Sequence, residues 1–504
     1  MDLLAVIVLY FSTLAYPGSF REGDWVNFTN FRFITSAAMD QTNIYFGTTN
    51  GVIRYDRFGN RWLDPMTITD GLPNERIDNI AYDPDYDRLY VSTPLGAAYY
   101  QPTFQQWYPA AGDFPTQLVR NDFRASALSA LTTEYGYTYL NGRLTDLAFN
   151  SYQLTRGVDD GFYHLFVGTY GLGPVVINSR YGDLKRLAYG PYTEDATVIF
   201  RIDDHFWMGG GLSDGVDPGI TTFDTTLQEW RWFVPRLTDG LASARLTCGI
   251  GDRKGIWLGT EYGLVHYDPE SERFITMADF SPLPSVMVTS LAADSAWVYV
   301  GTDYGLGYVG RDEFKHRRKK ESDSLTADSL DTGLPLSGKN RFRGWRINNL
   351  KVIDNYLYVA TNRGALRRPM GYYGDFEYVN TPESMLSDDI LDITKSGDSL
   401  FFATRNDVIV INTKTAQATT ITDPAQFGTW HIRKILIEGG NLWAATDAGL
   451  WKYRFSDAYS RLFTVGDGMI SDDVRSIEIL GDYIWLATPK GAIRFFWNRP
   501  GRFD

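Results

Sequence analysis

A thirteen-residue segment recurs along this chain and restricts its fold more than any other feature. It reads IWLGTEYGLVHYD at 256–268, LWAATDAGLWKYR at 442–454 and IWLATPKGAIRFF at 484–496. Alignment on its threonine brings nine threonines into register, and a glycine holds this position in a tenth copy: Thr48, Thr93, Thr169, Gly210, Thr260, Thr302, Thr361, Thr404, Thr446 and Thr488. The last four lie 43, 42 and 42 residues apart. Self-similarity at such a period predicts a repeat architecture.

The residues before the threonine predict strands that are covered on both faces. An aromatic residue lies three positions before each register position, and a glycine, alanine or serine lies one position before it. Residues two apart share one face of a strand, and the residue between them, which is apolar in every copy, faces the other way. A sandwich strand would alternate apolar with polar residues. The pattern therefore favours radially stacked sheets, with about 42 residues for each four-stranded propeller blade. The competing β-helix has shorter coils.

A glycine three residues after most of the threonines predicts a tight hairpin. Gly263, Gly305, Gly364 and Gly491 hold this position, and glycine adopts positive φ without strain. Asp407 replaces the glycine in one copy, and we expect it to adopt the left-handed conformation as well. The glycines are thus predicted to be structural. No lysine or helix of a phosphate-binding loop accompanies them.

The two ends of the chain predict closure of a ring. After Thr488 only one more strand-like segment follows, so the last unit lacks its outer strand. The segment DWVNFT at 24–29 resembles such a strand, and its pairing with the last unit would remove a sheet edge. We predict an all-β propeller over 24–497, with about ten four-stranded blades closed by the N-terminal strand. Two smaller tandem propellers are the alternative.

The first residues predict export. An apolar run from Leu3 to Phe11, followed by small residues at Thr13 and Ala15, resembles a secretory signal peptide over 1–15. An apolar first strand is the alternative reading. No other window is long and apolar enough for a membrane span. We expect a periplasmic or extracellular protein.

Charge and composition argue against several classes of function. The formal net charge of −13 disfavours a nucleic-acid partner, which requires a basic face. The only cysteine, Cys248, lies in an apolar context and is expected to be a small buried residue. The five histidines have no spacing typical of a metal site or a catalytic triad, and His266 is expected to pack within a blade. We predict no catalytic residue, no metal site and no cofactor.

The repeat resembles that of the two-component-regulator propeller family. The shared pattern is aromatic, apolar, small and Thr, then two residues, Gly-Leu and Tyr-Asp, with DGL later; it is clearest at 256–268 and 442–454. The resemblance implies an extracytoplasmic propeller of the sensor type, or a surface or secretion accessory protein, with carbohydrate-derived ligands for the sensors. The chain has no kinase, receiver or DNA-binding region. We therefore expect that any signalling would need a separate transducer protein.

Long insertions predict where recognition takes place. They lie near 110–150, 211–219 and 311–346, and we expect them on one face of the propeller. Insertions tolerated without function are the alternative. Five residues of the hairpin turns could surround a shared mouth and bind a sugar or peptide: Tyr170, Tyr262, Tyr304, Arg363 and Asp447.

Two hypotheses of function remain open from the sequence. The first is an exported, non-catalytic propeller that binds a glycan or protein partner as a sensor-like or surface-assembly module. The second is an exported carbohydrate-active propeller enzyme, a lyase or hydrolase. A cluster of histidines or carboxylates in the mouth of the ring would favour the second hypothesis, and an uncharged aromatic mouth the first.

Overall fold

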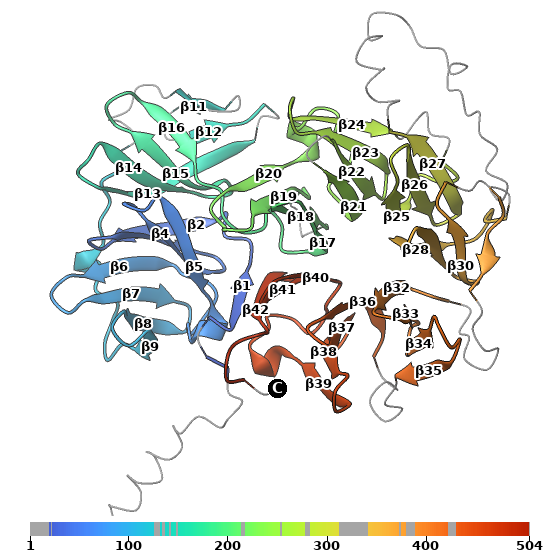
Figure 1. Cartoon of the computed structure of the whole chain (residues 1–504). Coiled ribbons are helices and arrows are strands. Elements are labelled where there is room, and N and C mark those ends of the chain that lie inside the picture. Colours follow the sequence, from blue (N-terminus) through green and yellow to red (C-terminus); the bar gives the residue numbers. More distant parts are fainter. Residues whose placement is uncertain are drawn as a thin grey trace, which may run out of the picture.

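The computed structural model shows an all-β protein built from antiparallel sheets, which confirms the propeller class (Figure 1). It describes residues 20–21, 23–124, 132–133, 137–140, 143–147, 150–212, 217–252, 255–277, 283–311, 341–371, 374–379, 389–421 and 430–502. The predicted signal peptide lies outside these residues, as do most of 125–149 and all of 312–340. Ten sheets form within the described residues.

Seven of the sheets close into a ring. They contain β17 (Ala196–Ile202), β18 (His205–Gly210), β19 (Ile220–Asp224) and β20 (Trp230–Phe233); β21 (Leu246–Asp252), β22 (Gly255–Thr260), β23 (Gly263–Asp268) and β24 (Arg273–Met277); β25 (Val288–Ala293), β26 (Trp297–Thr302) and β27 (Gly305–Gly310); β28 (Ile347–Ile353), β29 (Tyr356–Thr361), β30 (Gly364–Pro369) and β31 (Glu377–Tyr378); β32 (Asp392–Ser396), β33 (Ser399–Ala403), β34 (Val408–Asn412) and β35 (Ala418–Ile421); β36 (Ile432–Glu438), β37 (Asn441–Thr446), β38 (Gly449–Arg454) and β39 (Tyr459–Phe463); and β40 (Ser476–Leu480), β41 (Tyr483–Thr488) and β42 (Gly491–Phe496), joined by β1 (Trp25–Phe28).

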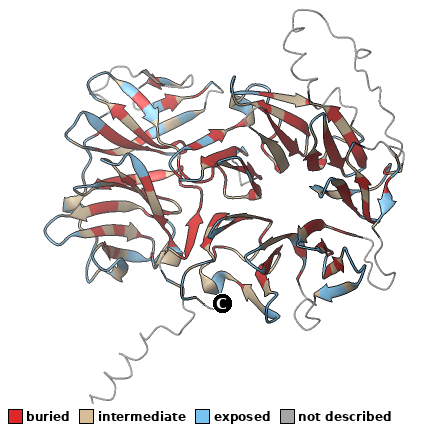
Figure 2. Ribbon diagram, viewed as in Figure 1, coloured by how far each residue is buried: buried red, intermediate tan, exposed pale blue. Residues whose placement is uncertain are grey.

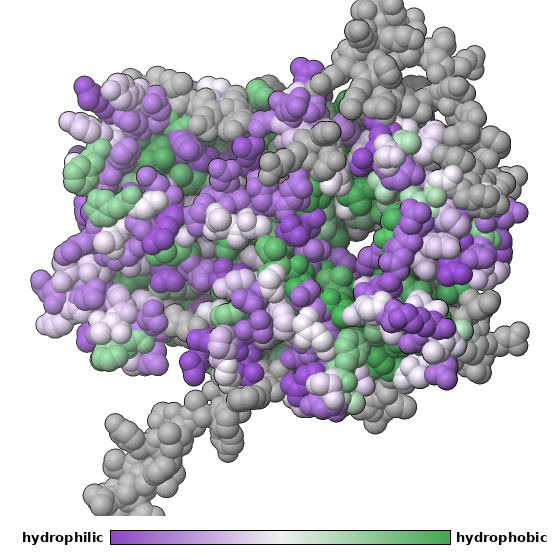
Figure 3. All heavy atoms as spheres, in the orientation of Figure 1, coloured by the Kyte–Doolittle hydropathy of each residue, from purple (hydrophilic) through white to green (hydrophobic). Residues whose placement is uncertain are grey.

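The inner strands define the order around this ring. They contact one another in the sequence β17, β21, β25, β28, β32, β36, β40 and back to β17. Figure 3 shows an opening between the atoms at the place that these strands surround in Figure 1. One ten-bladed ring is therefore wrong, because β40 meets β17 and not the first sheet after β1.

The other three sheets form an open arc beside the ring. They contain β2 (Ile34–Met39), β3 (Asn43–Thr48), β4 (Gly51–Asp56) and β5 (Arg61–Met66); β6 (Asn79–Asp83), β7 (Arg88–Thr93), β8 (Gly96–Gln101) and β9 (Gln106–Pro109); and β10 (Thr132–Thr133), β11 (Thr138–Leu140), β12 (Arg143–Thr145), β13 (Ser151–Asp159), β14 (His164–Thr169), β15 (Gly173–Asn178) and β16 (Asp183–Arg186). Short 3-10 helices η1 (Ile68–Asp70), η2 (Thr116–Leu118), η4 (Pro235–Leu237) and η7 (Val465–Asp467) lie in the connections. Strand β2 contacts both β6 and β13, so the sheet that comes first along the chain lies in the middle of the arc.

The small residue before the threonine leaves a space into which a side chain of the neighbouring sheet packs. A Cβ on Gly47 would lie 2.7 Å from Cγ2 of Ile77, the residue that leads into β6. In the same way, a side chain on Gly168 would overlap Ile34, on Gly209 Leu246, on Gly259 Val288 and on Gly301 Ile347. Hydroxyl groups reinforce these contacts: Thr35 donates to the carbonyl oxygen of Ile77 at 2.6 Å, and Thr247 to that of Val288 at 2.8 Å. At these junctions a sheet is therefore held by its neighbour through shape, and at the Thr35 and Thr247 junctions also by a hydrogen bond.

The register threonine closes the hairpin from within. The Thr260 hydroxyl donates to the Gly263 carbonyl at 2.9 Å and accepts the Tyr262 amide at 3.0 Å, and the other register threonines repeat this pattern. Gly263 has the predicted positive φ, 118°. Asp407 does not, so that prediction was wrong; instead Thr404 accepts the amides of both Asn406 and Asp407, which closes the turn without a left-handed residue.

One sheet of the arc has an open face. In the second strand of the other sheets every residue after the first is buried, whereas β7 alternates: Leu89, Val91 and Thr93 are buried, and Tyr90 and Ser92 are partly exposed. Within the described residues, no neighbouring sheet packs against the face that carries Ser92. The expectation that every strand is covered on both faces is therefore wrong at this end of the arc, while Figure 2 shows mainly buried residues along the strands of the ring.

The other end of the arc is covered by part of the 110–150 insertion. Phe123, Tyr139 and Leu144 are buried against the β13–β16 sheet, in one core with Val167 and Val175. These residues occupy the side of the sheet on which a preceding blade would pack. The described part of the insertion thus has a structural role.

The arc and the ring share one hydrophobic core. Phe28 of β1 and Phe31 pack with Phe46 of the arc and with Phe223 and Trp485 of the ring. The Tyr189 hydroxyl donates to the Leu63 carbonyl at 2.8 Å across the same junction. This continuity makes the described chain a single folded unit.

The contact between Gly168 and Ile34 provides a test of the order of the sheets in the arc. Gly168→Ala should lower the free energy of unfolding by about 1–3 kcal/mol, because the new methyl group overlaps Ile34 of the neighbouring sheet. Gly112→Ala is the control, since a Cβ there has open space around it. Denaturant unfolding measures both variants. If Gly168→Ala cost as much in an Ile34→Ala background, which lacks the overlapping Cγ2, as it does in the wild type, the two sheets would not be adjacent.

A buried carboxylate holds the two ends of the chain together. Asp24 is 1 % exposed and pairs with Arg499 and with Arg502, whose Nη1 lies 3.5 Å away. Asp24→Asn should cost about 3 kcal/mol of folding free energy, because Arg502 would remain buried without its counter-charge. The exposed Asp85→Asn is the matched control. Equal unfolding midpoints for the two variants in a denaturant titration would contradict this role.

Candidate functional site

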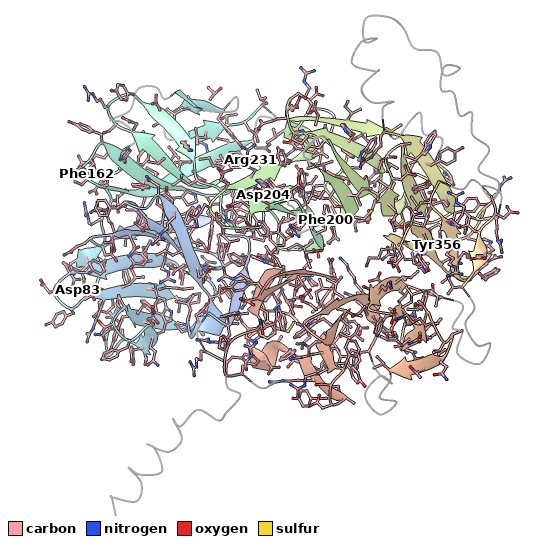
Figure 4. The ribbon with its side chains drawn as sticks, viewed as in Figure 1. Asp83, Phe162, Phe200, Asp204, Arg231 and Tyr356 are labelled. Carbon is pink, nitrogen blue, oxygen red and sulfur yellow. The ribbon has the colours of Figure 1, made fainter. Side chains whose placement is uncertain are left out.

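A large cleft lies where the arc meets the ring. Its volume is about 2200 Å³, and it is lined by β14–β16 and the β12 region of the arc, and by the outer strands β20 and β24 of the ring. Arg231 of β20, labelled in Figure 4, lies in this part of the molecule. Hydrophilic residues dominate the surface over the junction in Figure 3. A concave site of this size at the border of two structural units is typical of ligand binding.

Three arginines and four aromatic residues gather at the cleft, and we call them the arginine–aromatic cluster. Arg186, Tyr137, Tyr152, Tyr192 and Trp232 line the cleft, while Arg32 contacts Tyr192 and Arg236 contacts Tyr152 without lining it. The Arg186 guanidinium lies over Trp232, 5.2 Å from the ring centroid. Tyr192 packs against the edge of Trp232 with centroids 5.7 Å apart. Cation–π contacts of this kind hold a guanidinium in one place.

Arg32 lies beneath this layer. It is 3 % exposed, its guanidinium carbon lies 3.7 Å above the Tyr192 ring, and it donates to the Gly171 carbonyl at 2.8 Å. Burial lowers the pKa of Arg32 from its usual value. No carboxylate pairs with it among the described residues.

One carboxylate organises the opposite side of the cluster. Asp146, whose side chain is 2 % exposed, accepts hydrogen bonds from Asn150 and from the Tyr152 hydroxyl at 3.0 Å. Arg236 approaches it to 3.5 Å and also pairs with Asp217 at 2.5 Å. Burial is the main cause that raises the pKa of Tyr152, so its phenol stays protonated and acts as a donor.

The charges of the cluster do not balance. Arg236 has two carboxylate partners, whereas Arg186 has none among the described residues, and the exposed Lys185 precedes it. Acidic residues lie instead on the ring side of the cleft, where Glu272 pairs with Arg231 at 2.7 Å. The arc wall is therefore cationic in a chain whose net charge is −13.

The turn residues singled out in the sequence lie elsewhere. Tyr262, Tyr304, Arg363 and Asp447 are on the hairpin turns of four ring sheets, and Tyr170 is on the arc, where its ring contacts Phe33. None of the five lines the cleft. Asp447 accepts from the His431 amide and ring nitrogen at 2.6 and 2.8 Å, bonds that lower its pKa against the opposing effect of burial. A shared mouth of these residues stays a prediction.

Sequence reasoning missed the arginine–aromatic cluster. Its members come from the segment around Arg32, from the insertion, and from the third and fourth units, which meet only because the arc lies against the ring. The available signals were the aromatic outer strand WRWF at 230–233 and the 76-residue step from Thr93 to Thr169. His266, by contrast, packs on Trp257 with ring centroids 4.7 Å apart, as predicted.

Among the residues that the structure describes, no group of three or more histidine, cysteine, aspartate or glutamate residues is arranged to hold a metal ion. No helix within this part of the chain has the length and apolar character of a membrane span.

Comparison with known proteins shows the fold. No protein-family model matches the chain, and no curated protein matches its sequence. PorZ, a surface component of the type-IX secretion system of Porphyromonas gingivalis, is similar in structure with a TM-score of 0.54 and 10% identity, over 94% of this chain and 87% of that chain. The extracellular domain of BT4673 from B. thetaiotaomicron gives 0.46 and 15% identity, over 93% of this chain and 71% of that chain. At such low identities the likeness concerns the propeller fold alone.

The single cysteine should be unreactive in the folded protein. Cys248 is partly buried beside the core that the second and third ring sheets share, and desolvation raises the pKa of its thiol to about 12. At pH 8 only about one thiol in ten thousand would be ionised, and the thiolate is the nucleophile. Labelling with a thiol-specific disulfide reagent should be slow until guanidinium is added. Rapid labelling without denaturant would contradict the burial.

Proposed function

We propose that this protein is an exported, non-catalytic binding propeller that recognises its ligand in the cleft between the arc and the ring. The observation that carries the proposal is the cleft itself, with the arginine–aromatic cluster at its centre. Fixed guanidinium groups and tyrosine hydroxyls provide donors to a polar ligand, and the volume accommodates several residues of a glycan or peptide.

The resemblance of the repeat to that of the two-component-regulator propellers supports the same proposal. It favours an extracytoplasmic location and a sensor-like or surface-assembly role, with a separate protein to transmit any signal. The likeness to PorZ supports the fold on which such a role would depend. Recognition by the insertions at 211–219 and 311–346 remains part of the proposal.

Within the arginine–aromatic cluster, the state of Tyr152 argues against its use as a catalytic base; His164, His266 and several carboxylates line the rest of the cleft. A lyase needs a base that removes the proton from the sugar carbon next to the carboxyl group. The Tyr152 hydroxyl is the candidate for this base within the cluster. Burial raises its pKa and Asp146 accepts its proton in a hydrogen bond, so it is a poor base at neutral pH. The cluster is suited to hold a ligand.

Filling the cleft tests the proposal. Thr238 lines it with a half-buried side chain, so Thr238→Trp should weaken binding by at least about tenfold. Thr103→Trp places the same bulk on an exposed turn of the arc outside the cleft. Calorimetry with a panel of neutral and acidic oligosaccharides and of short peptides measures affinity, and mass spectrometry of the recovered ligand measures turnover. Binding that Thr238→Trp leaves unchanged would exclude the cleft, and cleavage or unsaturated products would favour the enzyme alternative.

A further inference from the structure

We infer that the arginine–aromatic cluster is a subsite for the carboxylate of an acidic saccharide, of the uronic acid type, with Arg186 as its principal ligand. The inference rests on the proposed function, and it specifies the chemical class of the ligand in the same cleft. It is drawn from the charge and the geometry of the cluster.

Arg186 is held in place but its charge is not neutralised. It is the last residue of β16, Trp232 lies under its guanidinium, and its side chain has no carboxylate partner among the described residues. A guanidinium presents parallel N–H groups that match the two oxygens of a carboxylate. Stacking on an indole fixes the plane and leaves the edge of the guanidinium available for such a bond.

The surroundings of Arg186 add to the preference for an anion. Arg32 is buried nearby with only neutral acceptors, Asn30 and Gly171, and Lys185 precedes Arg186. The two carboxylates beside the cluster, Asp146 and Asp217, both pair with Arg236. A single anionic group beside Arg186 would therefore bring the immediate surroundings of this residue closer to neutrality.

The remaining groups favour a saccharide as the carrier of that carboxylate. Tyr137 and Tyr152 are half-buried in the cleft wall, with their ring centroids 6.5 Å apart in a T-shaped arrangement. Such rings offer an apolar surface beside a polar hydroxyl, which suits the faces and hydroxyl groups of a sugar ring. The acidic residues on the ring side of the cleft, such as Asp268 and Glu270, can accept bonds from sugar hydroxyls but would repel a polymer with a high charge density. An acidic sugar within a largely neutral chain fits both walls.

The test compares two ligands that differ only in charge. A neutral oligosaccharide that carries one glucuronic acid residue and the methyl ester of that acid have the same sugar rings, but the ester has no carboxylate. The wild-type protein should bind the acid at least about tenfold more tightly than the ester, because charge-assisted hydrogen bonds are the stronger ones, and added salt should reduce the difference. Arg186→Gln should abolish the preference. Arg180→Gln is the matched control, since Arg180 also lies over tyrosine rings near β15 and β16 but outside the cleft.

Each outcome of this experiment separates the inference from the function on which it rests. Equal affinity for acid and ester, or a preference that survives in Arg186→Gln, would overturn the carboxylate subsite. Binding of a neutral oligosaccharide that Thr238→Trp weakens would then leave the proposed function standing. If no saccharide in the panel bound and a peptide did, the saccharide inference would fall while the cleft remained a binding site. Circular dichroism and the unfolding midpoint of Arg186→Gln establish that the variant is folded.

Discussion

The contact between a residue with little or no side chain and the aliphatic residue of the next sheet determines the whole architecture. Gly168, Gly209 and Gly301 leave space that Ile34, Leu246 and Ile347 fill, so the sheets approach closely at the inner strands and diverge toward the rim. Because protein interiors are close-packed, such a contact has one good geometry, and repetition of it produces a constant rotation between neighbours. The ring closes when seven sheets have been placed. Hydrogen bonds such as that from Thr247 to Val288 then fix the height of each sheet along the axis.

Much of the repeat could be predicted from the sequence because its physics is local. The alternation around Thr260 depends on strand periodicity, and the turn at Gly263 depends on backbone conformation within four residues. The pairing of β1 with β42 was also predictable, because the last unit lacked its own outer strand. Asp407 shows the limit of such reasoning: a side chain that tolerates a left-handed backbone was assumed to adopt it, but the hydroxyl of Thr404 made this unnecessary.

The partition into a ring and an arc could not be predicted, and the cleft was missed for the same reason. Ser92 is a small residue like those on which a neighbouring sheet packs, so the sequence around β7 does not reveal that this face of the strand is open. Arg186 and Trp232 belong to different sheets, and their contact depends on how the arc lies against the ring. Four of the five turn residues, Tyr262 and Tyr304 among them, lie on the closed ring, and only Tyr170 lies on the arc. With three sheets outside the ring, a large cleft lies between the two parts.

The order of sheets in the arc has a consequence for how this architecture can change. The chain leaves β9 at Pro109 and reaches β13 through the segment that carries Phe123, on the open side of the arc. Neither the shared core around Phe28 nor the pairing of the chain ends depends on this crossing. Duplicated repeats inserted there would pack first on the face of β7 that carries the partly exposed Ser92. The existing sheets at the two ends of the arc could keep their positions. Added units could thus extend the arc toward a second closed ring without any change of strand register in the existing seven-sheet ring.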